Sequence, residues 1–340
     1  MQYLFSFFLS LACSLIIIPI MKKLAKKLGF IDQPGFRKIH KNPIPFLGGL
    51  GLYLSFLISW LFVFKQINAW IVIYSSLYII FGLIDDRGIK IRARYKIFSH
   101  LLFSFLFVYF SGICFQFFSI RLLNIFLSIG FITFMANSMN MLDGMDGLVG
   151  GISAIASFFL FIHSLSCGQP ELALISIIIS GSCLGFLKYN FNPATIFLGE
   201  AGSTYLGFIL AAISIKLNIL ELWSVALSLN VARLQLISFI IPLIILGIPI
   251  FDTFFVFSNR FLHQIKFSQP GKDHSHHRIH LMGFSQKATV LTLYAVQIVL
   301  GSLSLSIVNA GLQQFFSLLA IVAVLAFFAW NFLTRVEVYS

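Results

Sequence analysis

The stretch YLFSFFLSLACSLIIIPIMKKLAKK, residues 3–27, decides what kind of protein this is. Residues 3–20 carry no charged side chain and are long enough to cross a bilayer as a helix. Four lysines follow within seven residues, and no small-residue cleavage site separates the two parts. The stretch therefore predicts a retained first transmembrane helix and not a removed signal peptide.

The rest of the chain continues this pattern. Of the 340 residues, 59% are hydrophobic and only 10% are charged, whereas a soluble domain has about 25% charged residues. Apolar segments compatible with spanning helices lie near 3–20, 46–64, 68–84, 97–112, 119–136, 148–165, 171–187, 203–217, 234–257, 288–309 and 312–333. We expect an all-α polytopic membrane protein with about eleven transmembrane helices in one domain, 1–340. Residues 218–233 are either an outer loop with an interfacial helix or a further span.

The distribution of charge predicts the orientation of these helices. Of the 23 Lys and Arg residues, 19 fall in the C-terminal tail and in the loops after the odd-numbered helices, which marks that side as cytoplasmic. The N-terminus is then outside and the C-terminus inside. Nine of the eleven acids fall on the same inner side, which predicts a cytoplasmic site. The net charge of +12 thus follows the membrane and does not indicate nucleic acid. The four cysteines are scattered and indicate no metal cluster or disulfide framework.

Two motifs place acids at helix ends. GLIDDRGIKIRARYK, residues 82–96, contains Asp85 and Asp86, and adjacent carboxylates at a membrane boundary need a cation or basic side chains to offset their repulsion. In NSMNMLDGMDGLVGG, residues 137–151, Asn137, Asn140 and Asp143 share one helix face by their spacing of three. Oxygen ligands of this kind suit Mg²⁺. The alternatives are basic inside anchors for the first motif and a polar helix cap for the second.

Three further stretches carry polar residues on the predicted cytoplasmic side. NFNPATIFLGEAGSTYLGF, residues 190–208, puts Glu200 just ahead of a Gly-Ser helix start that favours anions, although Ser203 is also an ordinary N-cap. GKDHSHHRIH, residues 271–280, could bind zinc, bind an anion or be an inert loop, and its flanking cations favour phosphate. IDQPGFRKIHKNPIPFLGG, residues 31–49, holds Arg37, Lys38 and His40, which are site residues or inside anchors.

These five blocks, in this order, resemble the polyprenyl-phosphate N-acetylhexosamine-1-phosphate transferase family of glycosyltransferase 4 type. The resemblance covers about residues 30–285 and rests on GLIDD, NxxNxxDGxDGL and PAxxFxGxxGS. It implies an enzyme that moves a HexNAc-1-phosphate from a UDP-N-acetylhexosamine to undecaprenyl phosphate and releases UMP. The loop shaped like DHxxHR is similar to the branch that initiates O-antigen, common antigen or teichoic acid synthesis, with UDP-GlcNAc as the expected donor.

The resemblance also implies roles for individual residues. The catalytic residues would be Asp85, Asp86 and Asp143. The substrate-binding residues would be Lys96 at the pyrophosphate, Asp146 and Phe197 at the uracil, and His274, His277 and Arg278 at anions. The metal ligands would be Asn140 and Glu200, for Mg²⁺ or alternatively Mn²⁺. Family members usually have Asp at position 200, and Glu reaches one methylene further, so the metal geometry there would have to adjust.

The remaining expectations concern location and alternatives. The active site would face the cytoplasm from a bacterial inner membrane, built by the loops 21–45, 85–96, 137–147, 188–203 and 258–287 and surrounded by membrane lipids. Direct attack by the lipid phosphate is favoured over a covalent aspartyl intermediate, since a phosphate monoester is mostly dianionic at pH 7. The alternatives are a phospho-N-acetylmuramoyl-pentapeptide transferase, a nucleotide-sugar transporter and a scaffold subunit without chemistry. A homodimer is left open.

Overall fold

Helices make up almost the whole protein. A computed structural model describes residues 1–33, 43–63, 68–89, 91–231, 233–267, 269, 271–308 and 310–338, without the side chains of residues 221 and 223. The first eight helices are α1 (Gln2–Leu28), α2 (Gly48–Val63), α3 (Ala69–Asp86), α4 (Ala93–Ser111), α5 (Arg121–Leu142), α6 (Leu148–Ser166), α7 (Pro170–Asn190) and α8 (Gly199–Lys216). The later ones are η2 (Leu220–Leu222), α9 (Trp223–Ser228), α10 (Leu234–Ser238), α11 (Ile240–Ile245), α12 (Gly247–Leu262), α13 (Ser275–Leu281), α14 (Gln286–Val308) and α15 (Leu312–Thr334).

The predicted class, an all-α polytopic membrane protein, is confirmed. Within the described residues, seven helices are long and apolar enough to cross a membrane, or eight if one bent pair counts as a span. Ten of the eleven predicted segments fall on one helix each, and 234–257 falls on α10, α11 and α12. Helices α2, α4 and α8 and the segment 234–257 are not among the seven. Eleven spans therefore stays a prediction. Residues 218–233 contain only short helices in their described part, η2 and α9. The one addition is a hairpin of two-residue strands, β1 (Ile31–Asp32) and β2 (Ile44–Pro45).

The segment predicted as one span at 234–257 is broken instead. Its two parts, Leu234–Ile245 and Gly247–Leu262, meet at an angle of 81°. Gly247 and Pro249 lie at the break. Glycine weakens a helix and proline lacks the N–H that continues the hydrogen-bond ladder, so this sequence favours a bend. The prediction rested on apolar content and not on the two helix-breaking residues, so it did not include the bend; that this segment spans the membrane stays a prediction.

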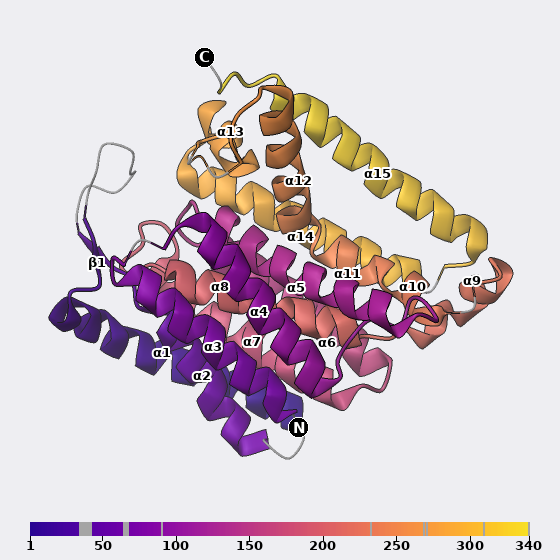
Figure 1. Cartoon of the computed structure of the whole chain (residues 1–340), viewed down its shortest axis with the longest axis horizontal. Helices are drawn as coiled ribbons and strands as arrows, with labels where there is room; N and C mark the ends of the chain where they lie inside the picture. Colours follow the sequence, from indigo (N-terminus) through magenta and orange to yellow (C-terminus); the bar gives the residue numbers. More distant parts are fainter. Residues whose placement is uncertain are drawn as a thin grey trace.

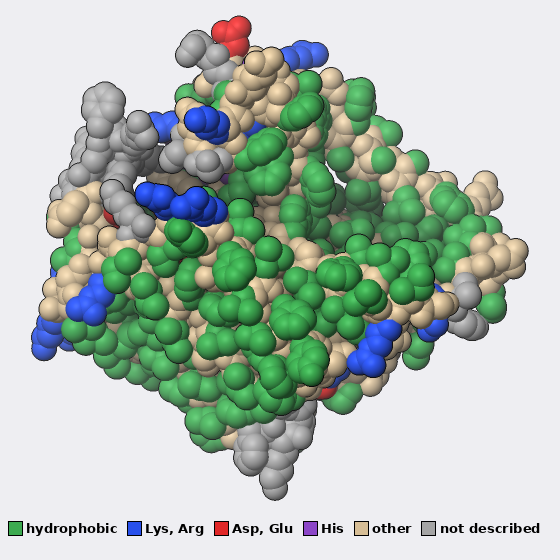
Figure 2. Space-filling model, in the orientation of Figure 1, with side chains coloured by type: hydrophobic (Ala, Val, Ile, Leu, Met, Phe, Trp, Pro, Cys, Tyr) green, Lys and Arg blue, Asp and Glu red, His purple; other side chains and the backbone are tan. Residues whose placement is uncertain are grey.

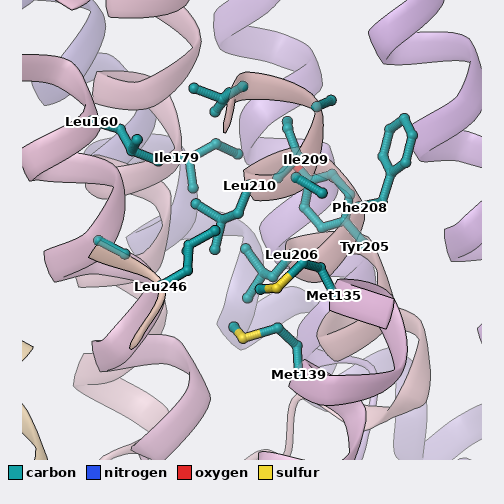
Figure 3. Close-up of a cluster of buried hydrophobic side chains, with 14 of the residues drawn as sticks. Met135, Met139, Leu160, Ile179, Tyr205, Leu206, Phe208, Ile209, Leu210 and Leu246 are labelled. Carbon is teal, nitrogen blue, oxygen red and sulfur yellow. The ribbon is translucent and has the colours of Figure 1, made fainter. Parts of the chain in front are cut away.

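Helix α8 forms the centre of the bundle. All of its residues from 200 to 215 are buried, and α2, α3, α5, α6 and α7 pack around it. Figure 3 shows side chains of α8 meeting Met135 of α5, Leu160 of α6 and Ile179 of α7. A helix that is buried on all sides is expected to be apolar on all its faces. The polar side chains of Thr204 and Ser214 fit this setting because their hydroxyl groups donate to backbone carbonyls of α8 itself. The position of α8 therefore fixes the position of every residue at its N-terminal end.

The outer surface is that of a membrane protein. Hydrophobic side chains cover most of the face seen in Figure 2, and the Lys and Arg side chains visible there lie toward the ends of the bundle. The C-terminal end of α1, the hairpin and α13 lie toward the same end of the molecule, whereas α15 stands outermost (Figure 1). Polar chemistry is thus confined to the ends of an apolar body.

Two glycines let neighbouring helices reach α8 at backbone distance. A Cβ atom added at Gly82 of α3 would lie 2.3 Å from Cα of Ala201, and one added at Gly49 of α2 would lie 2.3 Å from the amide nitrogen of Gly202. Neither backbone can move away without opening the helix pair. The end of α3, with its two acids, is therefore held directly against the first turn of α8.

We expect Gly82→Ala to destabilise the protein by about 1–3 kcal/mol, because it overpacks the α3 and α8 backbones. Gly130→Ala is the matched control: a Cβ atom at Gly130 of α5 meets nothing within 4 Å, so that change should be neutral or slightly stabilising. Thermal unfolding of both variants in detergent measures the difference. A Gly82→Ala variant that unfolds at the temperature of the wild type would show that the two backbones can separate freely.

Candidate active site

A large cavity opens at the end of the bundle where α3, α5 and α8 bring their acids together. Its volume is about 1240 Å³, above the range of about 300–1,000 Å³ typical of small-molecule sites. Six of the eleven predicted site residues line it: Asp85, Asp86, Asp143, Asp146, Phe197 and His277. Motifs that lie more than a hundred residues apart in sequence therefore share one cavity. Arg37, Lys38 and His40 lie outside the described residues.

Asp86 joins α3 to the N-terminus of α8. Its two carboxylate oxygens accept hydrogen bonds from the backbone amides of Glu200, at 2.9 Å, and Ala201, at 3.1 Å. The first amides of a helix have no partner within the helix, and a carboxylate there also meets the positive end of the helix dipole. Asp86 therefore holds the first turn of α8 in place, in addition to lining the cavity.

Lys96 bridges two acids instead of lining the cavity. Its ammonium group lies 2.8 Å from Asp85 and also forms an ion pair with Glu200. Asp85 is fixed further by the backbone amide of Ile91, at 3.0 Å. In this arrangement the charge of Lys96 is offset by two carboxylates.

Ser203 joins the side chain of Asn140 to the first turn of α8, which carries Glu200. The hydroxyl group of Ser203 donates to Oδ1 of Asn140 at 2.9 Å, one helical turn beyond Glu200. Oε1 of Glu200 is buried and has no hydrogen-bond partner, although the carboxyl group of Asp85 interacts with that of Glu200, and neither Glu200 nor Asn140 lines the cavity. A carboxylate and an amide oxygen fit a hard cation such as Mg²⁺. Within the described residues no group of three His, Cys, Asp or Glu is placed to hold a metal ion. An ion here would complete its shell with water and substrate oxygens, as Mg²⁺ commonly does.

Asp143 follows α5 directly and accepts no hydrogen bond from any described residue. Burial, together with the nearby carboxylates of Asp86 and Asp146, raises the pKa of its carboxyl to about 7. A carboxyl group with a pKa near 7 changes its protonation state within the physiological range. It is the acid in this cavity whose surroundings compensate its charge least.

Asp146, by contrast, accepts two hydrogen bonds through one of its oxygens, Oδ2. It accepts hydrogen bonds from the side-chain amide of Asn192 and the backbone amide of Ala194, both at 3.0 Å. Asn190 adds a second tie between the same loops, because it accepts from the backbone of Gly147 and donates to the carbonyl of Ile196. The loop after α5 and the loop before α8 are thus joined into one wall.

Phe197 lies in that wall, half-buried, with its backbone joined to the hairpin. Its amide donates to the carbonyl of Pro45 at 2.8 Å, and its carbonyl accepts from Gly48 at 3.0 Å. An aromatic ring held by its backbone on both sides and lining a cavity is suited to stack on a flat ligand.

The histidine loop, residues 271–280, is held in place by the carboxylate of Asp252. Nδ1 of His274 lies 2.7 Å from Asp252 of α12, and Asp252 also accepts hydrogen bonds from the backbone and hydroxyl groups of Ser275. Burial lowers the pKa of His274, but the Asp252 carboxylate outweighs that effect and the net shift is upward. Burial, with the positive charge of His274, lowers the pKa of His277 to about 4. His277 therefore meets the cavity as a neutral imidazole.

Arg278 is placed differently from the prediction. Its guanidinium group is buried and donates to the backbone carbonyls of Asp273, Leu333 and Val336, at 3.1, 3.0 and 2.6 Å. It also lies over the ring of Phe255. Neither Arg278 nor His274 lines the cavity. The structure gives Arg278 a role in joining the loop to the end of α15, and a role in anion binding stays a prediction.

Two further groups were missed by the sequence. Lys22 and Lys26 of α1 line the cavity; they fall in the loop 21–45 that was predicted to help build the site, but neither was named as a site residue. Asp252 was noted as an inner-side acid, without its partner His274. The spacing of Lys22 and Lys26, one helical turn apart, was the available signal for the first. No local signal could have joined Asp252 to His274 across 22 residues of helix and loop.

Comparisons with known proteins agree with this geometry. The model of glycosyl transferase family 4 matches residues 68–218. The Bacillus subtilis protein named "Probable undecaprenyl-phosphate N-acetylglucosaminyl 1-phosphate transferase" is 34% identical, over 86% of this chain and 81% of its own. The undecaprenyl-phosphate alpha-N-acetylglucosaminyl 1-phosphate transferase of Escherichia coli K12 is 28% identical, over 81% and 76%.

A third relative carries another name. The phospho-N-acetylmuramoyl-pentapeptide-transferase of Caldicellulosiruptor bescii is 30% identical, over 63% of this chain and 72% of its own. The first relative alone, with its identity and coverage, is sufficient to assign the family. The resemblance carried by the motifs is confirmed, and this chain belongs to glycosyl transferase family 4.

Proposed function

We propose that this protein transfers a HexNAc-1-phosphate from a UDP-N-acetylhexosamine, with UDP-GlcNAc as the preferred donor, to undecaprenyl phosphate and releases UMP. The observation that carries the proposal is the cavity, where acids from three separate motifs and Phe197 converge at one end of an apolar bundle. The names of the B. subtilis and E. coli relatives support the reaction and the sugar. A site at a membrane boundary suits a reaction between a soluble nucleotide and a lipid.

The proposed reaction is a single displacement at phosphorus. An oxygen of the lipid phosphate forms a bond to the sugar-bearing phosphorus of the donor, the bond from that phosphorus to the bridging oxygen breaks, and UMP leaves with the bridging oxygen. The lipid phosphate has a second pKa of about 6 and is mostly dianionic at pH 7, so a strong base is not required. Positioning and neutralisation of charge then supply most of the acceleration.

The residues divide this work between them. Phe197 stacks on the uracil and the wall around Asp146 orients it, while Asp85 and Asp143 orient the acceptor phosphate or take its last proton. His277 donates a hydrogen bond to a phosphate oxygen as a neutral imidazole, and Asp252 holds His274 and the loop in place. Asn140 and Glu200 would hold Mg²⁺, or alternatively Mn²⁺, which when bound neutralises charge on the diphosphate.

The setting of the reaction belongs to the same proposal. Eleven spans with the N-terminus outside and the C-terminus inside would place the cavity at the cytoplasmic face of a bacterial inner membrane, in one domain covering residues 1–340. The product would initiate a cell-surface polysaccharide of O-antigen, common antigen or teichoic acid type. A muramoyl-pentapeptide transferase is the second candidate, and the C. bescii relative is the observation that favours it.

Purified protein in detergent, supplied with Mg²⁺, undecaprenyl phosphate and a panel of UDP-sugars, should release UMP with UDP-GlcNAc in preference to UDP-GalNAc and UDP-MurNAc-pentapeptide. UMP release must depend on the lipid, which separates a transferase from a transporter or a hydrolase. Turnover of UDP-MurNAc-pentapeptide alone would replace the first candidate by the second.

Glu200→Asp should remain active, and Glu200→Ala should lose at least about a hundredfold in kcat/KM, because the free Oε1 of Glu200 is the metal donor in this proposal. Glu200→Gln is the matched control, since it keeps the size and removes the charge; it should resemble Ala. The measurement is a titration of activity with Mg²⁺. Equal activity of Glu200→Ala and the wild type at limiting Mg²⁺ would rule out the ligand role.

Asp143→Asn should abolish transfer and yet stabilise the protein at neutral pH. The carboxyl group has a pKa of about 7 in the folded protein and about 4 in an unfolded chain, so the folded state loses stability as the pH rises from 4 to 7. The neutral amide avoids that loss. The gain in Tm over the wild type should therefore grow from pH 5 to pH 8, reaching about 2 °C or more. A gain in Tm that is the same at pH 5 and pH 8 would contradict the raised pKa of Asp143.

A further inference from the structure

The acids and the cations of the cavity come from different elements. Among the described residues, the acids that line it are Asp32, Asp85, Asp86, Asp143 and Asp146, whereas its cationic side chains are Lys22, Lys26 and Lys272. A nucleoside diphosphate and a phosphate monoester would bring further negative charge into this space. Cations that are not already neutralised by protein carboxylates are therefore needed next to the substrates.

Lys96, the lysine that the sequence assigns to the pyrophosphate, does not meet that need in this structure. Its ammonium group is bound by both Asp85 and Glu200, and it does not line the cavity. Lys22, Lys26 and Lys272 line the cavity, and none of them forms an ion pair with a described carboxylate. The uncommitted positive charge in the described part of the cavity thus lies on α1 and on the histidine loop.

Lys22 and Lys26 belong to a run of four lysines, and the fold separates them from the other two. Residues four apart on a helix share one face, so Lys22 and Lys26 form one pair and Lys23 and Lys27 another. Only the first pair lines the cavity, while Lys23 and Lys27 are exposed outside it. Anchoring to the inner side of a membrane would require only positive charge near the helix end, and both pairs supply that equally.

Two like charges placed one turn apart repel each other, and here neither ammonium group forms an ion pair with a described carboxylate. A bound anion removes that repulsion and is bound by two charge-assisted contacts at once. Lysine is a point charge on a flexible stem, and such a cation can follow a phosphate group that moves during transfer.

We propose that Lys22 and Lys26 are substrate-binding residues that hold phosphate oxygens in the cavity that they share with the acids of α3 and of the loop after α5. The inference rests on the proposed function and adds to it the element that receives the phosphates. The phosphates belong either to the UDP-sugar or to the polyprenyl phosphate, and the two sources are separated by the measurements below.

The test compares two double variants of the full-length protein, Lys22→Ala/Lys26→Ala and Lys23→Ala/Lys27→Ala. Both remove two positive charges from the same seven residues, so their effects on membrane insertion are matched. KM is measured for UDP-GlcNAc and for undecaprenyl phosphate, and Kd for UDP is measured by calorimetry without lipid. Thermal unfolding confirms that both variants are folded, and Lys22→Arg/Lys26→Arg tests rescue by a retained charge.

We expect Lys22→Ala/Lys26→Ala to raise one KM by about tenfold or more, the arginine variant to recover most of that loss, and Lys23→Ala/Lys27→Ala to resemble the wild type. A rise in KM for UDP-GlcNAc together with Kd for UDP assigns the lysines to the donor diphosphate. A rise in KM for undecaprenyl phosphate alone assigns them to the acceptor. Values that are the same for both alanine variants overturn the proposal.

Failure of the proposed function is distinguishable from failure of this inference. If the wild type releases no UMP from UDP-GlcNAc with undecaprenyl phosphate, the proposed reaction fails. The lysines are then tested by the Kd values for UDP and for inorganic pyrophosphate, which need no turnover. A matched Kd in the two alanine variants overturns the inference in that case also.

Discussion

The contact of the Asp86 carboxylate with the first amides of α8 is the interaction on which the site depends. It joins the end of one helix to the start of another across more than a hundred residues of sequence. Because α8 is buried on all sides, it cannot shift to relieve a poor fit, and the acid must come to it. The glycine at position 82 makes that approach close enough. The same turn of α8 then positions Glu200 and Ser203. Ser203 in turn binds the side chain of Asn140.

The sequence predicted the fold class and the residues that gather at the site better than the contacts between their side chains. Helices fall on every predicted segment, because twenty apolar residues in lipid leave the backbone few alternatives. Four of the five acids predicted as site residues line the cavity, since acids at the same end of neighbouring helices lie close together; Glu200 is the fifth and does not line it. The bend at Gly247 could have been predicted from Gly247 and Pro249, but not its angle, which depends on what α11 and α12 pack against.

What could not be predicted are the pairings across elements. The sequence shows that Lys96 follows an acid pair, but not that Glu200 would compete for its ammonium group. It shows Arg278 beside histidines, but not that the carbonyls of another helix would lie within reach of the guanidinium. A basic side chain near an acid cluster has several partners in reach, and only packing decides among them. Assignments made one residue at a time are weakest where one cation serves several oxygens.

Helix α15 is constrained by far fewer contacts with the rest of the protein than α8 is. Of its 23 residues only Phe315 and Leu333 are buried, and its packing against the rest of the protein is confined to a few side chains such as Leu318, Val322 and Trp330. Its last turn is held in addition by a hydrogen bond, because Arg278 binds the carbonyl of Leu333. That bond is made to the backbone, which every amino acid provides. Substitutions along α15 that keep it apolar and long enough to span should therefore accumulate freely over evolutionary time, while the length between α14 and the last turn should not vary.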